Sequence, residues 1–181
     1  MYAQGRGVAA DPARALEWYC LAAAQGVANA QFNAGVMYAN GQGVERDEAR
    51  AVAWYQAAAG QGDASALNNL GVMYANGQGV ARSDADAVAC YRQAAGQGHA
   101  LAQYNLGGMY NGGRGVARDP VQAFMWISVA AASGNASAAA QREQMRARLS
   151  PAQLADAQAL AAQFQPSPAP AGRETRAQAN A

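Results

Sequence analysis

The ten residues GVMYANGQGV at positions 35–44 return unchanged at positions 71–80. A close copy, GGMYNGGRGV, occupies positions 107–116, so the period is 36 residues. A fixed period of this size is typical of a solenoid, in which each unit is too small to bury its own apolar face and is stable only when packed on its neighbours. Function is therefore to be sought on a repeated surface rather than in one pocket.

Each unit is predicted to contain two helices, A and B, joined by a glycine-rich link. In the unit of residues 65–100, we expect helix A over 65–75 and helix B over 84–96. Gly77 should end helix A, because glycine adopts the left-handed C′ conformation without a Cβ penalty. Helix B should begin after a side chain that accepts an amide hydrogen bond. The residues at this N-cap position are Asp11, Asp47, Ser83 and Asp119.

Helix B carries one apolar stripe, because its apolar residues recur at i, i+3, i+4, i+7 and i+8. In the first copy these residues are Ala15, Trp18, Tyr19, Ala22 and Ala23. Helix A has an interior glycine at positions 35, 71 and 107, which costs roughly 1 kcal/mol relative to alanine. We expect this glycine to admit a partner backbone or a bulky ring. The Trp and Tyr rings are accordingly interpreted as packing residues rather than as a cofactor site.

The chain divides into three parts. Residues 1–136 are expected to form the repeats, with the first unit truncated at its N-terminus, since Met1 aligns with Met37. Residues 137–165 are expected to be C-terminal capping helices that cover the last repeat. The second of these should begin at a capping box at 150–153 and use Leu154, Leu160 and Phe164 for contact. The Pro/Ala-rich segment 166–181 is expected to be disordered.

Composition excludes several classes of protein. The net charge is +1, with 13 Lys and Arg against 12 Asp and Glu, and no basic stripe supports a nucleic-acid partner. No segment approaches the roughly 18 apolar residues of a membrane span. Cys20 and Cys90 lie two units apart and are expected to be free thiols. The N-terminus has no secretory signal, so the default location is cytoplasmic. The chain begins inside a repeat, so a periplasmic location stays open if an upstream segment is missing.

The repeated pattern A-x-x-N-L-G-x-M-Y-x-x-G-x-G-V, followed by W-Y-x-x-A-A-x-Q-G in helix B, resembles the Sel1-like repeat of bacterial proteins. It is related to the 34-residue tetratricopeptide repeat. The resemblance implies an all-α fold, a right-handed α/α superhelix. It also implies a non-catalytic scaffold that binds a protein or peptide on its concave surface, in bacteria often in envelope signalling, exopolysaccharide export or host contact.

Sequence patterns for chemistry are weak. Nucleophilic catalysis needs a nucleophile, a base and an orienting group, whereas His99, the only histidine, lies in an inter-repeat turn where we expect it to be solvated. Metal ligands do not cluster at short spacing, and the Gly-x-Gly links lack the residues that hold phosphate. We therefore expect no catalytic residue, metal or cofactor. The alternatives are a cell-wall-related hydrolase or ligand-binding protein, and a structural fragment of a longer array.

The remaining candidate is a row of amides on successive A helices. Stacked A helices line the concave side of tetratricopeptide-type solenoids, and the resemblance implies that the Asn of the Asn-Leu-Gly motif contacts peptide backbone there. Alternatively, these side chains cap turns or satisfy buried carbonyls. Basic residues for an acidic terminus are absent from the matching positions 29, 65 and 101, so a neutral extended segment fits better. The candidate groove residues are Asn29, Asn33, Asn40, Asn69, Asn76 and Asn105.

Overall fold

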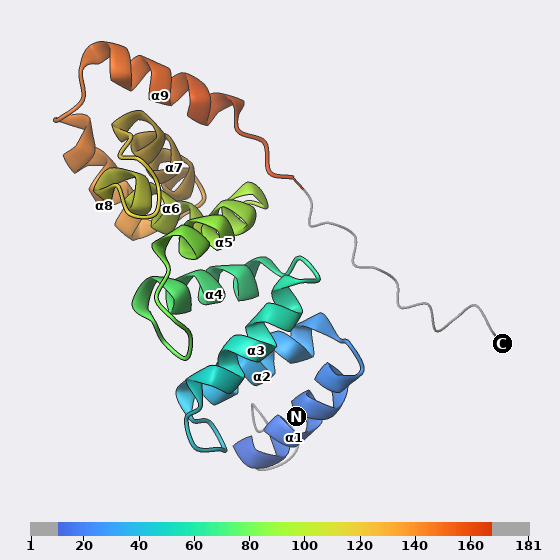
Figure 1. The fold of residues 1–181 in the computed structure, drawn as a ribbon. Coiled ribbons are helices and arrows are strands. Elements are labelled where there is room, and N and C mark those ends of the chain that lie inside the picture. Colours follow the sequence, from blue (N-terminus) through green and yellow to red (C-terminus); the bar gives the residue numbers. More distant parts are fainter. Residues whose placement is uncertain (1–10, 168–181) are drawn as a thin grey trace.

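The computed structural model of the protein describes residues 11–167 of the 181. Within that range the chain forms nine helices and no strand (Figure 1). The expected all-α solenoid is confirmed. The start of the truncated first unit and most of the expected disordered tail lie outside the described residues. The helices are α1 Pro12–Ala24, α2 Ala28–Asn40, α3 Glu48–Ala59, α4 Ala64–Asn76, α5 Asp84–Gly96, α6 Ala100–Gly112, α7 Pro120–Ala132, α8 Ala136–Arg146 and α9 Pro151–Gln163.

The helices are stacked in chain order, which is the arrangement of a solenoid. Consecutive helices from α1 to α8 contact one another, and α9 returns to pack on α7. The A helices are α2, α4 and α6, and the B helices are α1, α3, α5 and α7. Helix α4 is one residue longer at each end than expected, and α5 has the expected bounds.

The predicted N-caps of the B helices are confirmed. The Asp47 carboxylate accepts a hydrogen bond from the Arg50 amide at 2.9 Å, and the Ser83 hydroxyl accepts one from the Asp86 amide at 3.2 Å. Asp11 and Asp119 make the same contact in their units. Each cap satisfies an amide at the helix start that has no partner within the helix.

The glycine-rich link joins one unit to the unit before it. Gly77 ends α4 in the left-handed conformation at φ +70°. Gly79 follows at φ +64° and lies against the first turn of α3, where an added Cβ would be only 2.3 Å from the Glu48 carbonyl carbon. The second glycine therefore permits close contact between neighbouring units as well as a turn.

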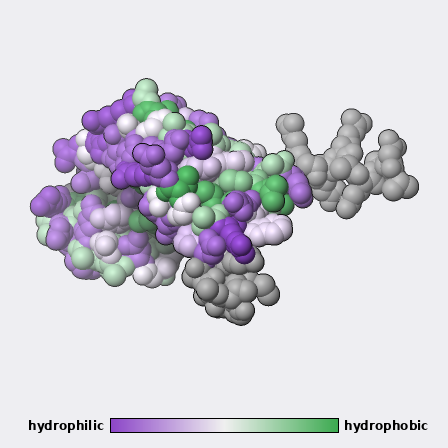
Figure 2. Space-filling view, turned by 90° about the horizontal axis from the view of Figure 1, so that it is seen from below, coloured by the Kyte–Doolittle hydropathy of each residue, from purple (hydrophilic) through white to green (hydrophobic). Residues whose placement is uncertain are grey.

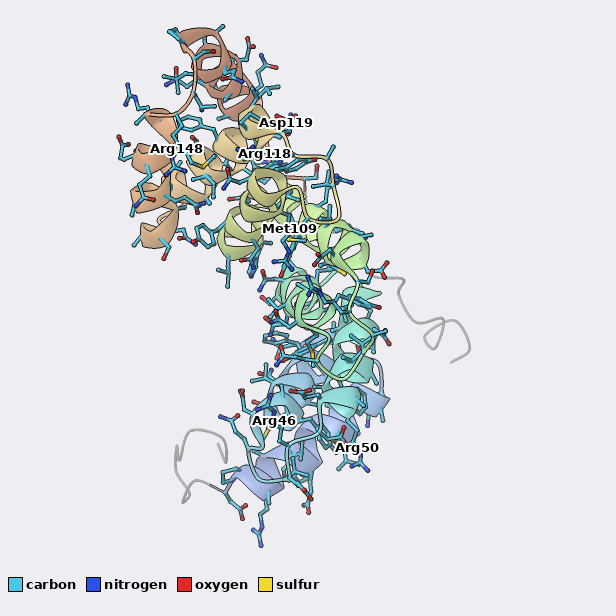
Figure 3. The ribbon with its side chains drawn as sticks, turned by 60° about the vertical axis from the view of Figure 1, so that its left-hand side comes forward. Arg46, Arg50, Met109, Arg118, Asp119 and Arg148 are labelled. Atoms are coloured by element: carbon cyan, nitrogen blue, oxygen red, sulfur yellow. The ribbon has the colours of Figure 1, made fainter. Side chains whose placement is uncertain are left out.

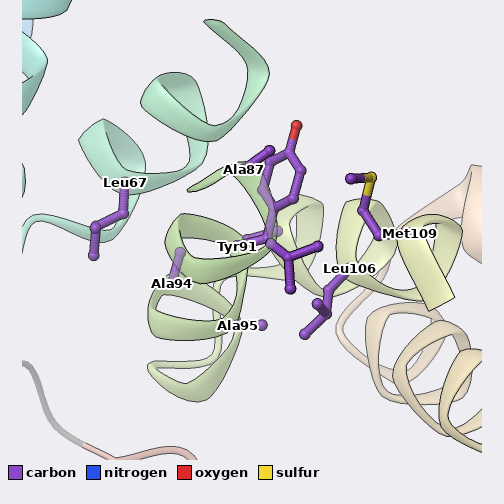
Figure 4. Close-up of a cluster of buried hydrophobic side chains, with 9 residues drawn as sticks. Leu67, Ala87, Tyr91, Ala94, Ala95, Leu106 and Met109 are labelled. Carbon is purple, nitrogen blue, oxygen red and sulfur yellow. The ribbon is translucent and has the colours of Figure 1, made fainter. Parts of the chain in front are cut away.

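The interior glycine of each A helix accommodates a large side chain from the following B helix. An added Cβ would lie 2.7 Å from the Tyr55 ring at Gly35 and 2.6 Å from the Tyr91 ring at Gly71. At Gly107 the neighbour is Ile127. Figure 4 shows the Tyr91 ring in a cluster of buried side chains contributed by successive helices. The expected contact between glycine and a ring is confirmed in two units.

The tryptophan side chain of helix B packs against the preceding pair of helices. Trp54 packs against the cluster that contains Ala15 and Met37, and Trp126 packs against the cluster that contains Leu106. Trp18 is 62% exposed, so its expected burial is wrong. The physical reason is that α1 is the first helix of the described residues, and no described helix precedes it.

The surface seen from below Figure 1 is largely hydrophilic, with small hydrophobic groups between (Figure 2).

The two cysteines are free, as expected. Cys90 occupies the tryptophan position of its unit and is 8% exposed within the cluster below it. Burial raises the pKa of the Cys90 thiol to about 11, so the thiol is protonated at neutral pH. It acts as a small buried hydrophobe.

The last helix packs on the last repeat through one stripe. The capping box that begins α9 is confirmed, since the Gln153 amide donates to the Ser150 hydroxyl and the Ser150 amide donates to the Gln153 side chain. Ala157 is fully buried, and the Phe164 ring meets Trp126 edge-on at 5.3 Å. Leu160 lies at the edge of this stripe and is 37% exposed, so it does not make the predicted contact.

Candidate peptide-binding groove

Hollows open along the array in the described part of the chain, and three of them recur with the repeat. The first has a volume of about 320 Å³ and lies between α2 and α4, with residues such as Asn40, Tyr55 and Asn69 in its wall. The second, of about 370 Å³, includes Asn76, Tyr91 and Asn105. The first two hollows share Val72 and so adjoin each other.

The third hollow, of about 360 Å³, lies where the end of α6 and the start of α7 meet α8 and α9. Met73, Met109 and Met145 occupy the same repeat position in the first, second and third hollow. The hollows are therefore the same part of the surface, displaced by one repeat each time. Figure 3 shows Arg46, Met109 and Arg148 along one side of the array.

The floor and rim of the first two hollows differ in polarity. Met73 and Met109 are buried, whereas Asn40 and Asn76 at the ends of α2 and α4 are exposed. An exposed amide can both donate and accept a hydrogen bond, which matches the donor and acceptor of a peptide unit. The arrangement offers apolar contact below and amide hydrogen bonds at the edge.

A chain of amides connects the first two hollows. Asn68 is 2% exposed; its side chain donates to the Asn69 oxygen at 3.3 Å and accepts from Asn105 Nδ2 at 3.1 Å. Asn69 also bonds the Tyr55 hydroxyl, whose pKa is raised because the ring is buried. Since Asn68 depends on both neighbours, Asn69 and Asn105 have a structural role beside any role in binding. The structure thus supports the alternative of amides that satisfy buried polar groups.

The six candidate asparagines are divided by the structure. Asn40 and Asn69 line the first hollow, and Asn76 and Asn105 line the second. Asn29 and Asn33 are not in the walls of the three hollows. Asn33 instead donates to the side chain and to the backbone oxygen of Asn29, both at 2.8 Å.

The family model for the Sel1 repeat matches residues 1–27, 28–63, 64–99 and 100–135. The last three matches begin at or next to the first residues of α2, α4 and α6. The chain belongs to the Sel1 repeat family. Sel1 repeats are generally protein-interaction modules and typically non-catalytic.

Two solved structures show the same architecture. A protective antigen present in uropathogenic Escherichia coli strains, which displays an SLR fold, is 36% identical with a TM-score of 0.84 over 90% of this chain. A Sel1 repeat protein from Oxalobacter formigenes is 36% identical with a TM-score of 0.71 over 76% of this chain. This chain spans 35% and 56% of the length of those two chains. No curated protein matches.

Charged residues of the Sel1 repeats were not anticipated as part of the site. Arg114 donates to the Asp84 carboxylate at 2.6 Å, and this bond holds the pKa of Asp84 below its ordinary value. In the unit before, Gln78 donates to Glu48 at the equivalent place, at 3.4 Å. Glu48 and Gln78 line the first hollow and Arg114 the second. The signal in the sequence was the recurrence of polar residues in the link at the period of 36 residues.

No group of three or more His, Cys, Asp or Glu side chains within residues 11–167 could hold a metal ion. No helix in that range is both long and apolar enough to cross a membrane. His99, expected to be solvated, is instead the N-cap of α6: its Nδ1 accepts from the Ala102 amide at 3.2 Å.

The His99 cap predicts a pH dependence of stability. Burial lowers the pKa of the half-buried imidazole, so folding favours the neutral ring that can accept the amide. The cap contribution, about 1 kcal/mol, should be present above the unfolded-state pKa near 6.5 and be lost as the pH falls through the lower folded-state value. Urea titrations between pH 8 and pH 4 should show this loss for the wild type.

The matched control is His99→Asn, because Asn135 caps α8 at the equivalent position and accepts from the Ala138 amide at 2.9 Å. This variant should keep the cap and lack the His99 part of the pH dependence. The same acid sensitivity in both proteins would contradict the assignment.

Proposed function

We propose that this Sel1 repeat array is a non-catalytic scaffold that binds an extended peptide segment of a partner protein along the three hollows. The observation that carries the proposal is the repetition of one hollow in register with the repeat. An extended peptide presents its backbone amides at regular intervals, so a surface with a regular interval can bind successive parts of it. Buried methionines contribute apolar contact in each hollow.

The amides at the rim are proposed to bind the peptide backbone. Asn40 and Asn76 hold the same repeat position, at the C-terminal ends of α2 and α4. Among the described residues, the Asn76 side chain donates to the neighbouring Gln78 side chain alone, at 3.3 Å. Both side chains lie outside the Asn68 network, so they can be changed without leaving a buried amide unsatisfied.

The hydrolase alternative receives no specific support. His99 is the only histidine, and its Nδ1 is occupied by the cap of α6.

A random peptide library displayed on phage tests the proposal without a known partner. Wild-type protein should select peptides, and changing both Asn40 and Asn76 to alanine should weaken their binding roughly 30-fold. This figure assumes a net value of about 1 kcal/mol for each neutral hydrogen bond. Binding can be measured by fluorescence anisotropy, and melting temperature should be recorded for each variant.

Asn33→Ala is the matched control, because Asn33 is an A-helix asparagine whose amide is bonded to Asn29 outside the hollows. It should leave peptide affinity unchanged. Selected peptides whose affinity is equally insensitive to all three substitutions would show that the hollows are not the binding surface.

A further inference from the structure

We propose that the third hollow binds a carboxylate side chain of the peptide, so that the array recognises a segment with an acidic residue at the position that reaches α8 and α9. This inference rests on the proposed function and specifies the chemistry of its ligand. The third hollow departs from the first two in its charged residues.

In the first two units, the arginine two residues before the first residue of helix B is paired with a carboxylate. Arg46, in the first hollow, pairs with Glu48. Arg82, one repeat later, pairs with Asp84 at 3.2 Å. Both acidic residues occupy the first position of a B helix, where a negative charge also suits the helix dipole. An arginine at this repeat position therefore has a carboxylate two residues further along the chain.

That carboxylate is missing from the third hollow. Arg118 is the equivalent arginine, and the first residue of its B helix is Pro120. Within residues 11–167, Arg118 has no ion pair. The adjacent Asp119 carboxylate accepts from the Val121 and Gln122 amides, both at 2.9 Å, as the cap of α7.

The C-terminal helices add a second cation. Arg148, just beyond α8, lines the same hollow as Arg118 and likewise has no ion pair in the described part of the chain. Asn111 adds an amide where the first two hollows have Ala39 and Ala75. Glu143 on α8 pairs with Arg142 at 3.3 Å, and neither residue lines the hollow.

The composition of the hollow favours an acidic side chain. Two guanidinium groups offer paired N–H donors that match the two oxygens of a carboxylate. Met145, which is 7% exposed, and the half-buried Leu149 provide an apolar floor for the methylene groups of glutamate. Since Arg46 and Arg82 already have carboxylate partners, an acidic residue in this hollow would also fix the direction of the bound peptide.

The first experiment uses a small probe, N-acetyl-glutamate methylamide, followed by NMR of the arginine Nε–H signals. The signals of Arg118 and Arg148 should shift on titration, and those of Arg46 and Arg82 should not. The neutral probe N-acetyl-glutamine methylamide should cause no shift. Equal shifts with both probes, or stronger binding of inorganic phosphate than of the carboxylate probe, would overturn the assignment.

The second experiment places the same chemistry in a peptide. Peptides selected by wild-type protein should be enriched in Asp or Glu at one position. The double change Arg118→Gln and Arg148→Gln should lower the affinity for these peptides about tenfold or more. The matched control, Arg46→Gln with Arg82→Gln, should lower the peptide affinity by a smaller factor. Peptides that bind without acidic enrichment would overturn this inference and leave the groove standing. If the probe binds but no peptide is selected, the proposed function fails and the anion site remains.

Discussion

Replacing Gly79 with alanine should lower the free energy of unfolding by roughly 2 to 5 kcal/mol. Two costs combine. The residue is held at φ +64°, a conformation that costs an L-residue about 1–2 kcal/mol. The new methyl group would also overlap the Glu48 carbonyl carbon at 2.3 Å and the Ala49 nitrogen at 2.7 Å. Overpacking typically costs about 1–3 kcal/mol, and here the neighbour is backbone, which cannot rotate away.

The control is Gly26→Ala, which separates the two costs. Gly26 has φ +86°, but an added Cβ there would meet nothing within 4 Å. This variant should lose only the conformational part, about 1–2 kcal/mol. Urea denaturation followed by circular dichroism measures both. Equal losses for the two variants would show that the contact between the link and α3 adds nothing to stability.

Replacing Phe164 with alanine should lower the free energy of unfolding by about 2 kcal/mol. Truncating a fully buried phenylalanine costs roughly 3–5 kcal/mol, and Phe164 is half-buried against Trp126. The substitution would leave Trp126 without its edge-on partner. The loss should appear in the same denaturation assay, and the larger Trp126 exposure should be visible in its fluorescence.

Leu160→Ala is the matched control within α9. Because Leu160 is 37% exposed at the edge of the contact stripe, its truncation should change the free energy of unfolding by less than about 0.5 kcal/mol. A loss at Leu160 as large as the loss at Phe164 would contradict the packing of α9. We propose on the same grounds that α8 and α9 are the cap of the array, since they cover the apolar face of α7.

The two sets of stability variants also bear on the hollows. The first hollow lies next to the Gly79 contact, because Gln78 and Glu48 are both in its wall. The third hollow exists only where α9 begins beside α8. Melting data for the glycine and phenylalanine variants therefore provide the reference against which losses of peptide binding are judged.

The repeat itself was determined by the sequence. A fixed period, an N-cap acceptor at each B helix and a glycine at each A-helix end are local signals, because each acts within one or two turns of the chain. The role of the interior glycine could also be predicted from the sequence. Glycine destabilises a helix, so its recurrence there indicates close contact with a large neighbour. Gly35 and Tyr55 confirm this reasoning.

The burial of the repeated aromatic residues depended on neighbours outside their own helix. Trp18 and Trp54 share a repeat position, and only Trp54 has a described helix pair beneath it. Leu160 and Phe164 both belong to the apolar pattern of α9, and only the packing of α9 on α7 decides which of them is covered. The periodicity of apolar residues predicts on which face of a helix a residue lies, but it does not predict where the neighbouring helix packs on that face.

The candidate groove was only partly accessible from the sequence. The asparagines at the period of 36 residues could be found, but their separation into rim amides and a buried network required the position of Asn68 between α4 and α6. Arg118 and Arg148 are thirty residues apart in the chain, and only the return of the chain after α8 places both in one hollow. Local periodicity is written in the sequence because it arises from short-range hydrogen bonds and side-chain spacing. The charge of the third hollow is decided by the tertiary structure, because it depends on which distant side chains the fold brings together.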